Sequence, residues 1–182
     1  MKYAAYLLVA KAERGLVSKD DNNISLYIGI PFCPTRCIYC SFVSHDAGRM
    51  IKYADEYTEK LCTEIACTGE IIKDLGMNVR SVYFGGGTPT ALSPENLTKL
   101  FDAVQSSIDL TRCEEYTVEA GRPDTVTCEK LSAIKKGGIG RISINPQTTS
   151  DETLKIIGRN HTYKDFLDAF DLARSMGFDN IN

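Results

Sequence analysis

Three cysteines stand close together near the start of the sequence. The segment from Tyr27 reads YIGIPFCPTRCIYCSF, which places Cys33, Cys37 and Cys40 in a CxxxCxxC pattern within eight residues. Three thiolates at this spacing can bind one face of an iron-sulfur cubane and leave its fourth iron without a protein ligand. An open iron of this kind is a position at which a small molecule can chelate.

Two other interpretations of these cysteines stay open at this point. Together with His45, the three thiols provide four N and S ligands at short spacing, which is what a structural zinc site needs. The thiols could also be core residues, although three of them in one loop that contains prolines are poor material for a packed core. The remaining cysteines are scattered, and core or surface positions explain them best: Cys62, Cys67, Cys113 and Cys128.

A glycine triplet follows the second predicted strand, in the segment YFGGGTPT. Gly86 and Gly87, with Thr88 after them, allow a backbone to pass very close to a ligand and offer unhindered N–H and C=O groups. The GxGxxG spacing of a dinucleotide site is absent. Taken alone, the triplet is better explained by a turn.

Two polar residues stand at the ends of further predicted strands. Glu119 ends the third strand in YTVEAG, and Gln147 follows the fourth in RISINPQ. Either residue alone is most often an exposed cap. Their importance depends on which elements bring them near the cysteines.

Short runs rich in β-branched and aromatic residues alternate with longer stretches of helical periodicity. The predicted strands are Ile24–Ile30, Val79–Phe84, Tyr116–Glu119, Ile139–Ile144 and a strand from Phe178 onward. The predicted helices are one from about Met50 to Leu75, one capped by Ser93 that runs to about Ile108, and three capped by Thr127, Ser150 and Thr162 that end at Gly137, Gly158 and Gly177. The longest should place one stripe in the core: Tyr57, Leu61, Ile65, Ile72 and Leu75.

Strands separated by single helices must be parallel, because a right-handed crossover returns the chain to the same edge. The predicted fold class is therefore α/β, with an open parallel sheet or a partial (β/α) barrel. The cysteine loop, the glycine triplet, Glu119 and Gln147 all follow the carboxyl ends of successive strands. Ligands bind at that edge in α/β sheets and barrels, so we expect these groups to share one crevice.

Length and composition are those of an ordinary globular chain. The chain has 182 residues, of which 43% are hydrophobic and 25% charged, and its formal net charge is -3. The basic residues are scattered, so we expect no nucleic-acid partner. No apolar run is long enough to span a membrane. Seven cysteines are an odd number, and without an export signal they indicate a reducing compartment, the cytoplasm.

Residues 1–23 are expected to form a helical N-terminal extension, because the apolar run after Lys2 is followed at once by charged residues and no cleavage site. Residues 24–182 are expected to form the core domain. The sequence stops at Asn182, inside the fifth predicted strand and without a helix to cover it. Because a parallel strand is normally buried on both faces, we expect the domain to be incomplete, as in a fragment or a truncated chain.

These motifs together resemble the radical S-adenosylmethionine (SAM) superfamily. CxxxCxxC with Tyr39 before the last cysteine, GGGTP, the strand-end glutamate and IxxxPQ followed by DxxLKxxGRxHT is a specific combination that covers nearly all of the chain from Ile24. Within the superfamily the chain is most similar to the oxygen-independent coproporphyrinogen III oxidase/dehydrogenase group, and ISINPQT with VEAGRPD is similar to its HemZ-like branch.

The resemblance implies two cofactors, a [4Fe-4S] cluster and SAM. It implies that the open iron chelates the amino and carboxylate groups of SAM and that a 5'-deoxyadenosyl radical abstracts a substrate hydrogen. The cluster ligands would be Cys33, Cys37 and Cys40. The residues near the cofactors would be Tyr27 beside the cluster, the Tyr39 backbone near adenine, Gly86, Gly87 and Thr88 along SAM, Glu119 as a partner for SAM, and Gln147 and Arg159 nearby.

The resemblance also implies a function in haem biosynthesis, the oxidative decarboxylation of coproporphyrinogen III. The implied partners are a tetrapyrrole substrate and an electron donor such as flavodoxin or ferredoxin. The chain departs from the porphyrinogen enzymes at Phe42, where they have a further cysteine. A haem-binding chaperone is therefore the alternative, because relatives with a similar ending after the last cysteine carry haem without making it.

Overall fold

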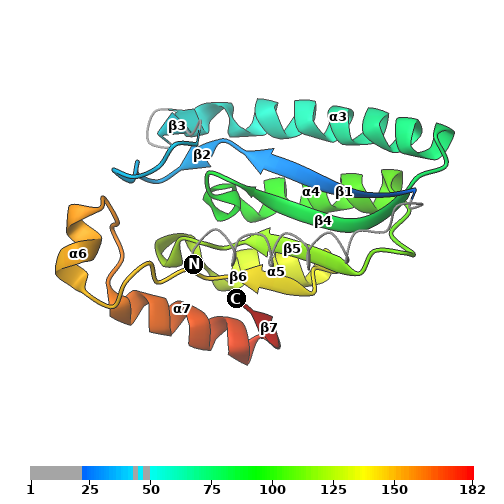
Figure 1. Cartoon of the computed structure of the whole chain (residues 1–182). Helices are drawn as coiled ribbons and strands as arrows, with labels where there is room; N and C mark the ends of the chain where they lie inside the picture. The colour runs from blue at the N-terminus through cyan, green and yellow to red at the C-terminus, as the bar shows by residue number, and fades with distance from the viewer. Residues whose placement is uncertain (1–21, 43–44, 47–49) are drawn as a thin grey trace, which may run out of the picture.

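The computed structural model describes residues 22–42, 45–46 and 50–182. Its centre is a parallel sheet of five strands in the order β1-β4-β5-β6-β7 (Figure 1). The strands are β1 (Asn23–Ile30), β4 (Asn78–Gly86), β5 (Glu115–Glu119), β6 (Arg141–Ser143) and β7 (Asn180–Ile181). All five predicted strands are therefore present, and the prediction of a parallel α/β sheet is confirmed.

One helix or a pair of helices connects each strand to the next. The helices are α3 (Ala54–Asp74), α4 (Pro94–Ser107), α5 (Cys128–Lys136), α6 (Asp151–Ile156) and α7 (Tyr163–Ser175). Single 3-10 turns precede or separate them: η1 (Ile51–Tyr53), η2 (Pro89–Ala91) and η3 (Pro123–Thr125). A second, two-stranded parallel pair joins β2 (Phe32–Cys33) to β3 (His45–Asp46).

The predicted helix caps are confirmed. The side-chain oxygens of Ser93, Thr127 and Ser150 each accept a hydrogen bond from a backbone N–H in the first turn of the following helix. Thr162 does the same and forms a reciprocal capping box with Asp165. These bonds satisfy backbone donors that a helix start leaves unpaired, so the sequence signals fix where α4 to α7 begin.

The predicted stripe of α3 is confirmed in its middle and wrong at its end. Leu61, Ile65 and Ile72 are buried against the sheet, and Tyr57 is partly buried with its hydroxyl donating to the Gly29 carbonyl oxygen over 2.6 Å. Leu75 is 59% exposed, because the helix ends at Asp74 and the chain turns away toward β4.

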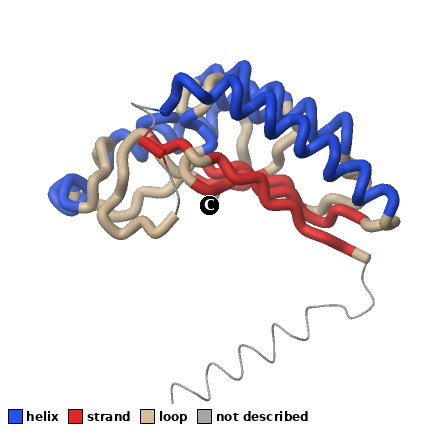
Figure 2. The backbone as a smooth tube through the Cα atoms, turned by 90° about the horizontal axis from the view of Figure 1, so that it is seen from above, coloured by secondary structure: helices blue, strands red, loops and turns tan. Residues whose placement is uncertain are grey.

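The long helices cover one face of the sheet. Figure 2 shows α3 and its neighbours on one side of the strands, and no described helix on the other side. The strand residues that face the helices form the core together with apolar side chains of α3, α4 and α5, and they include Ile28, Val82, Phe84, Val118 and Ile142. This one-sided arrangement is that of a partial (β/α) barrel, as predicted.

The carboxyl ends of the strands all lie at one end of the sheet. In Figure 1 this end carries the β2/β3 pair and α6, so the cysteine loop lies above the ends of β4 and β5. The helical extension predicted for residues 1–23 falls almost entirely in residues 1–21, outside the described part of the chain.

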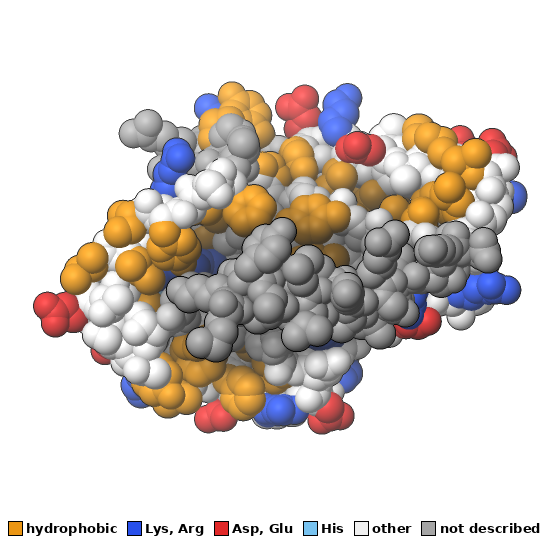
Figure 3. Space-filling view, viewed as in Figure 1, with side chains coloured by type: hydrophobic (Ala, Val, Ile, Leu, Met, Phe, Trp, Pro, Cys, Tyr) orange, Lys and Arg blue, Asp and Glu red, His pale blue; other side chains and the backbone are white. Residues whose placement is uncertain are grey.

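Charged side chains of both signs are mixed around the rim of the face drawn in Figure 3, and hydrophobic side chains gather below α3. The part of this face that is drawn in colour shows no continuous basic patch of the kind that binds nucleic acid. Among the described helices, none combines the length and the hydrophobicity needed to cross a bilayer.

Candidate functional site

The three cysteines of the motif lie in and after β2, at the carboxyl end of the sheet. Cys33 belongs to β2, and its Sγ lies 3.4 Å from the Thr88 hydroxyl oxygen. Cys37 is buried, and a turn brings the Cys40 amide within 3.1 Å of the Cys37 carbonyl oxygen. None of the three forms a disulfide, so all three thiols are available as ligands.

The glycine triplet lies directly under this loop. The two backbones are so close there that no side chain would fit between them. The Gly87 amide donates to the Ile30 carbonyl oxygen over 2.7 Å, and a Cβ added to Gly87 would meet the Phe32 carbonyl oxygen at 2.6 Å. The glycine triplet, residues 85–87, is called the glycine ridge below, and it holds the end of β4 against the start of the cysteine loop. This close approach brings Thr88 within reach of Cys33.

Gly85, the first glycine of the triplet, makes room for two tyrosines. A Cβ at this position would lie 2.8 Å from the Tyr27 hydroxyl oxygen and 2.7 Å from the Tyr83 ring. The two rings stack, with centroids 5.7 Å apart and an angle of 13° between planes. The Tyr83 hydroxyl then donates to Glu119 Oε1 over 2.5 Å.

These contacts hold the proton on both phenols. Burial, the hydrogen bond to Glu119 and the charge of that carboxylate all raise the pKa of Tyr83. Burial and the same carboxylate raise the pKa of Tyr27. Tyr83 therefore stays a donor that fixes Glu119 at the end of β5, with the second carboxylate oxygen left for another partner.

A second polar group joins the cysteine loop to the segment after β6. The Tyr39 hydroxyl donates to Gln147 Oε1 over 3.1 Å and accepts a bond from Arg159 Nη2 over 2.9 Å. Arg159 Nη1 donates to the Gly121 carbonyl oxygen over 3.2 Å. Gln147 itself has a φ of 64°, a strained conformation for a residue with a side chain.

All but one of the predicted site residues line a single cavity of about 150 Å³. Its walls consist of Cys33, Cys37, Tyr39, Cys40, Phe42, Gly86, Gly87, Thr88, Glu119, Gly121, Arg122, Asn145, Gln147 and Arg159. Tyr27 is the exception: it lies on β1 and borders another cavity of about 220 Å³ beside α3. It stacks on Tyr83, which in turn hydrogen-bonds to Glu119 in the wall of the first cavity.

Two observations show that the cavity suits a ligand with a cationic and an anionic end. Arg159 Nε is a buried donor without a hydrogen-bond partner, which an acceptor such as a carboxylate would satisfy. Glu119 offers an acceptor in the same cavity. The soft thiols of the loop are the ligands that iron-sulfur clusters use.

The zinc alternative gains no support from the structure. Within residues 22–42, 45–46 and 50–182, no group of three or more His, Cys, Asp or Glu side chains is arranged to hold a metal ion. This includes Cys33, Cys37 and Cys40, so the arrangement of the thiols does not by itself distinguish iron from zinc. The side chain of His45, the fourth ligand in that hypothesis, lies outside the described part of the structure.

Sequence reasoning missed several residues of the cavity. Asn145 follows β6, and Gly121 and Arg122 follow β5, so the rule that placed Glu119 and Gln147 at strand ends could also have found them. No sequence signal places Arg122 against Cys37, because that contact depends on how the turn after β5 folds back.

The comparisons with known proteins agree with this arrangement. A family model described as the Radical SAM superfamily matches residues 27–182. The chain belongs to the radical SAM superfamily. The cofactors of this superfamily, a [4Fe-4S] cluster and SAM, are therefore the cofactors of the chain.

Two curated relatives illustrate the similarity. The chain is 44% identical to the oxygen-independent coproporphyrinogen-III oxidase-like protein HemZ of Bacillus subtilis, over 88% of this chain and 32% of HemZ. It is 38% identical to the heme chaperone HemW of the same organism, over 87% of this chain and 41% of HemW. The chain thus spans a third to two-fifths of the length of these relatives.

A solved structure extends the similarity to the fold. Coproporphyrinogen III oxidase (HemN) from Escherichia coli, described as a radical SAM enzyme, matches with a TM-score of 0.76 and 25% identity, over 89% of this chain and 36% of HemN. The structure of anSMEcpe with bound AdoMet matches with a TM-score of 0.56 at 14% identity, which is a likeness of fold alone.

Proposed function

We propose that the chain forms the cluster-binding and SAM-binding part of a radical SAM enzyme of haem biosynthesis, which oxidatively decarboxylates coproporphyrinogen III without oxygen. The observation that carries the proposal is the single cavity that three thiols share with the glycine ridge, Glu119 and Arg159. The names of HemZ and HemN support the choice of substrate.

In this proposal Cys33, Cys37 and Cys40 hold the cluster. The Thr88 hydroxyl, 3.4 Å from Cys33 Sγ, can donate to that thiolate, and the glycine ridge keeps the loop in place. When bound, the cluster and SAM supply a 5'-deoxyadenosyl radical that abstracts a substrate hydrogen. The protein contributes binding, orientation and the exclusion of water.

Glu119 and Arg159 have opposite charges and both line the cavity. SAM carries an ammonium group, a carboxylate and ribose hydroxyls. Glu119 can accept a hydrogen bond from the ammonium group or from a ribose hydroxyl, and Arg159 can donate one to the carboxylate. Tyr83 orients Glu119, and Tyr39 orients both Arg159 and Gln147. Gly86, Gly87 and Thr88 provide a backbone edge along which SAM can lie.

The test uses the intact protein, reconstituted anaerobically with iron and sulfide and then mixed with SAM and a reductant. We expect broad visible absorption from the cluster, formation of 5'-deoxyadenosine, and release of carbon dioxide when coproporphyrinogen III is added. Cys37→Ala should abolish the absorption and the 5'-deoxyadenosine.

Cys67→Ala is the matched control, because Cys67 is an exposed thiol on α3 outside the cavity. The variant should behave as the wild-type protein does. A protein that carries a complete cluster and still forms no 5'-deoxyadenosine would contradict the enzyme proposal. Stoichiometric zinc in place of iron would restore the structural-site hypothesis.

A haem-binding chaperone is the second candidate. The name of HemW supports it, as does Phe42, a 60% exposed side chain in the cavity wall at the position where the porphyrinogen enzymes have a cysteine. The two functions give different products. Stable haem binding by the intact protein, with no loss of carbon dioxide from coproporphyrinogen III, would favour the chaperone.

The proposal includes an electron donor and a compartment. A cluster that cleaves SAM needs electrons, which flavodoxin or ferredoxin supplies in the cytoplasm. The seven cysteines without a disulfide partner are consistent with a reducing compartment.

A further inference from the structure

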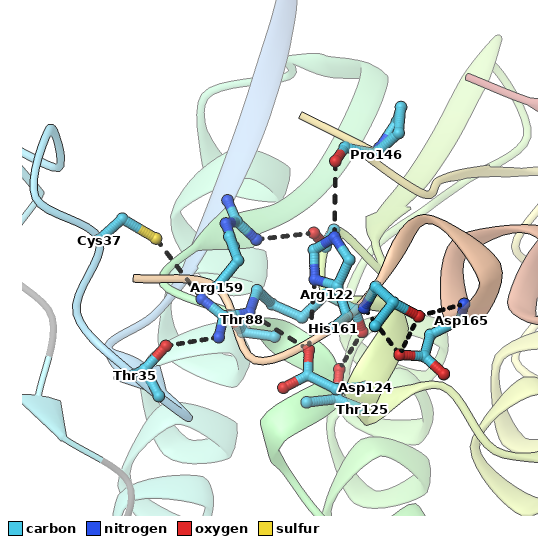
Figure 4. Close-up of polar contacts among 12 residues, drawn as sticks. Thr35, Cys37, Thr88, Arg122, Asp124, Thr125, Pro146, Arg159, His161 and Asp165 are labelled. Carbon is cyan, nitrogen blue, oxygen red and sulfur yellow. Dashed lines mark hydrogen bonds and ion pairs between the residues drawn. The ribbon is translucent and has the colours of Figure 1, made fainter. Parts of the chain in front are cut away.

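A buried arginine lies directly behind the cysteine loop. Arg122 follows β5, and its side chain is 3% exposed. Its Nη1 lies 3.5 Å from Cys37 Sγ, and its Nη2 donates to the Thr35 hydroxyl oxygen over 2.6 Å (Figure 4). The two ends of one guanidinium fork therefore contact two residues of the loop, one of them a proposed cluster ligand.

The positive charge of Arg122 faces one carboxylate among the described residues. Asp124 forms this ion pair with Arg122, with 3.4 Å between Arg122 Nε and Asp124 Oδ1. The same Oδ1 lies 3.9 Å from His161 Nδ1. Burial lowers the pKa of His161 although the Pro146 carbonyl and Asp124 act in the opposite direction, so its ring is neutral at pH 7 and adds no second cation there.

Burying an arginine is costly unless its donors and its charge are matched. A neutral thiol is a weak acceptor, whereas a thiolate that ligates iron carries negative charge and accepts N–H bonds readily. The geometry around Arg122 is thus better suited to Cys37 as a metal-bound thiolate than to Cys37 as a free thiol.

Thr35 extends this contact to the segment that follows α6. Its hydroxyl donates to the Gly158 carbonyl oxygen over 2.7 Å while it accepts from Arg122. The Ile38 amide donates to the Ile157 carbonyl oxygen over 3.2 Å, so the loop is attached to the end of α6 at two points. Arg122 therefore fixes the position of Cys37 as well as its electrostatic surroundings.

We propose that Arg122 is a positioning residue that donates to the Cys37 thiolate and raises the reduction potential of the cluster. The inference rests on the proposed function, in which Cys37 is a cluster ligand. Hydrogen bonds and positive charge near cluster sulfurs stabilise the reduced form, which has the greater negative charge. Removing the donor should make the cluster harder to reduce.

The experiment is an anaerobic redox titration of the reconstituted intact protein, followed by electron paramagnetic resonance. Arg122→Gln should make the midpoint potential more negative by about 59 mV. This shift corresponds to about a tenfold change in the equilibrium constant of a one-electron reduction. Arg122→Lys keeps the charge but not the fork, so its potential should lie between those of Arg122→Gln and the wild type.

Asp124→Asn tests the sign of the effect without touching the thiol contact. It removes the negative charge that offsets Arg122, so the midpoint potential should become less negative. Arg141→Gln is the matched control, because Arg141 is an arginine paired with a carboxylate, Glu115 at 2.8 Å, and lies outside the cavity. Its potential should equal that of the wild type.

The outcomes separate the two proposals. A wild-type protein that binds no iron and sulfide would overturn the ligand assignment and, with it, the role of Arg122. A wild-type protein with a cluster and an Arg122→Gln variant of unchanged potential would overturn the role of Arg122 alone. If Arg122→Gln retains too little iron to titrate, an unchanged potential in both Arg122→Lys and Asp124→Asn would overturn that role.

Discussion

The two faces of the sheet differ although the same strands supply both. Toward the helices, β4 and β5 contribute Val82, Phe84 and Val118, all with no exposed surface. Toward the open face the alternate positions include Tyr83 and Glu119, which hydrogen-bond to each other. Parallel strands that are buried on both faces are usually apolar throughout. The polar alternation here separates a face that packs into the core from a face that carries hydrogen-bonded polar side chains.

The largest effect is expected on the helix face. Phe84→Ala removes a fully buried ring that contacts Phe101 edge-on, with centroids 5.2 Å apart. It should lower the free energy of unfolding by about 3–5 kcal/mol, as other buried phenylalanines do. Urea unfolding of the intact protein measures the loss. A loss below about 1 kcal/mol would contradict the assignment of this face as the core.

On the open face, Glu119→Gln should affect binding more than stability. A hydrogen bond to a charged group contributes about 1.5–3 kcal/mol, so SAM affinity should fall about tenfold or more. Isothermal titration of the reconstituted protein measures it. Glu115→Gln is the control, because Glu115 lies on the same face of β5 but pairs with Arg141 outside the cavity. Equal losses in both variants would refute a specific role for Glu119.

Two tyrosines on neighbouring strands sharpen the contrast further. Tyr83→Phe breaks the bond to the Glu119 carboxylate and should cost about 1.5 kcal/mol of stability, the lower end of the range for a bond to a charged group. Tyr116 faces the helices, and its hydroxyl is buried without a hydrogen-bond partner. Tyr116→Phe should therefore be neutral or stabilising. Thermal unfolding of the two variants, measured in parallel, checks this difference in stability. A Tyr116→Phe variant less stable than Tyr83→Phe would show that the bond from Tyr83 to Glu119 does not stabilise the fold.

The smallest effect concerns alkaline pH. The pKa of Tyr83 is raised by burial and then by Glu119, with Ser143 acting in the opposite direction, whereas the unfolded chain titrates tyrosine near its usual value of about 10. A raised pKa means that the stability is fully present below about pH 10 and is lost as the pH rises through the folded value. Tyr83→Phe should flatten this decline in urea unfolding above pH 10. A decline as steep as in the wild type would show that other groups cause it.

Much of the fold could be predicted because its signals are local. Ser93, Thr127, Ser150 and Thr162 cap helices where hydroxyl residues precede periodic apolar stretches, and the single helices between strands require parallel pairing. The end of α3 could not be predicted from periodicity. Leu75 continues the apolar spacing, but the chain has already left the helix there.

The site divides in the same way. The strand-end rule brought Glu119, Gln147 and the cysteines into one cavity, because it depends only on the direction of the strands. The strand-end rule does not predict which side chains contact one another. The register that sets Tyr27 beside Tyr83, and the turn that carries Arg122 under Cys37, are both products of the three-dimensional fold.

The glycine ridge bears on protein engineering. Gly87 has no space for a side chain because the backbone of the cysteine loop already occupies that space, at Ile30 and Phe32. Loop and ridge are thus complementary halves of one module. A designer who grafts the CxxxCxxC loop onto another α/β scaffold would have to transplant the ridge as well, since an alanine at the position of Gly87 would displace the start of the loop.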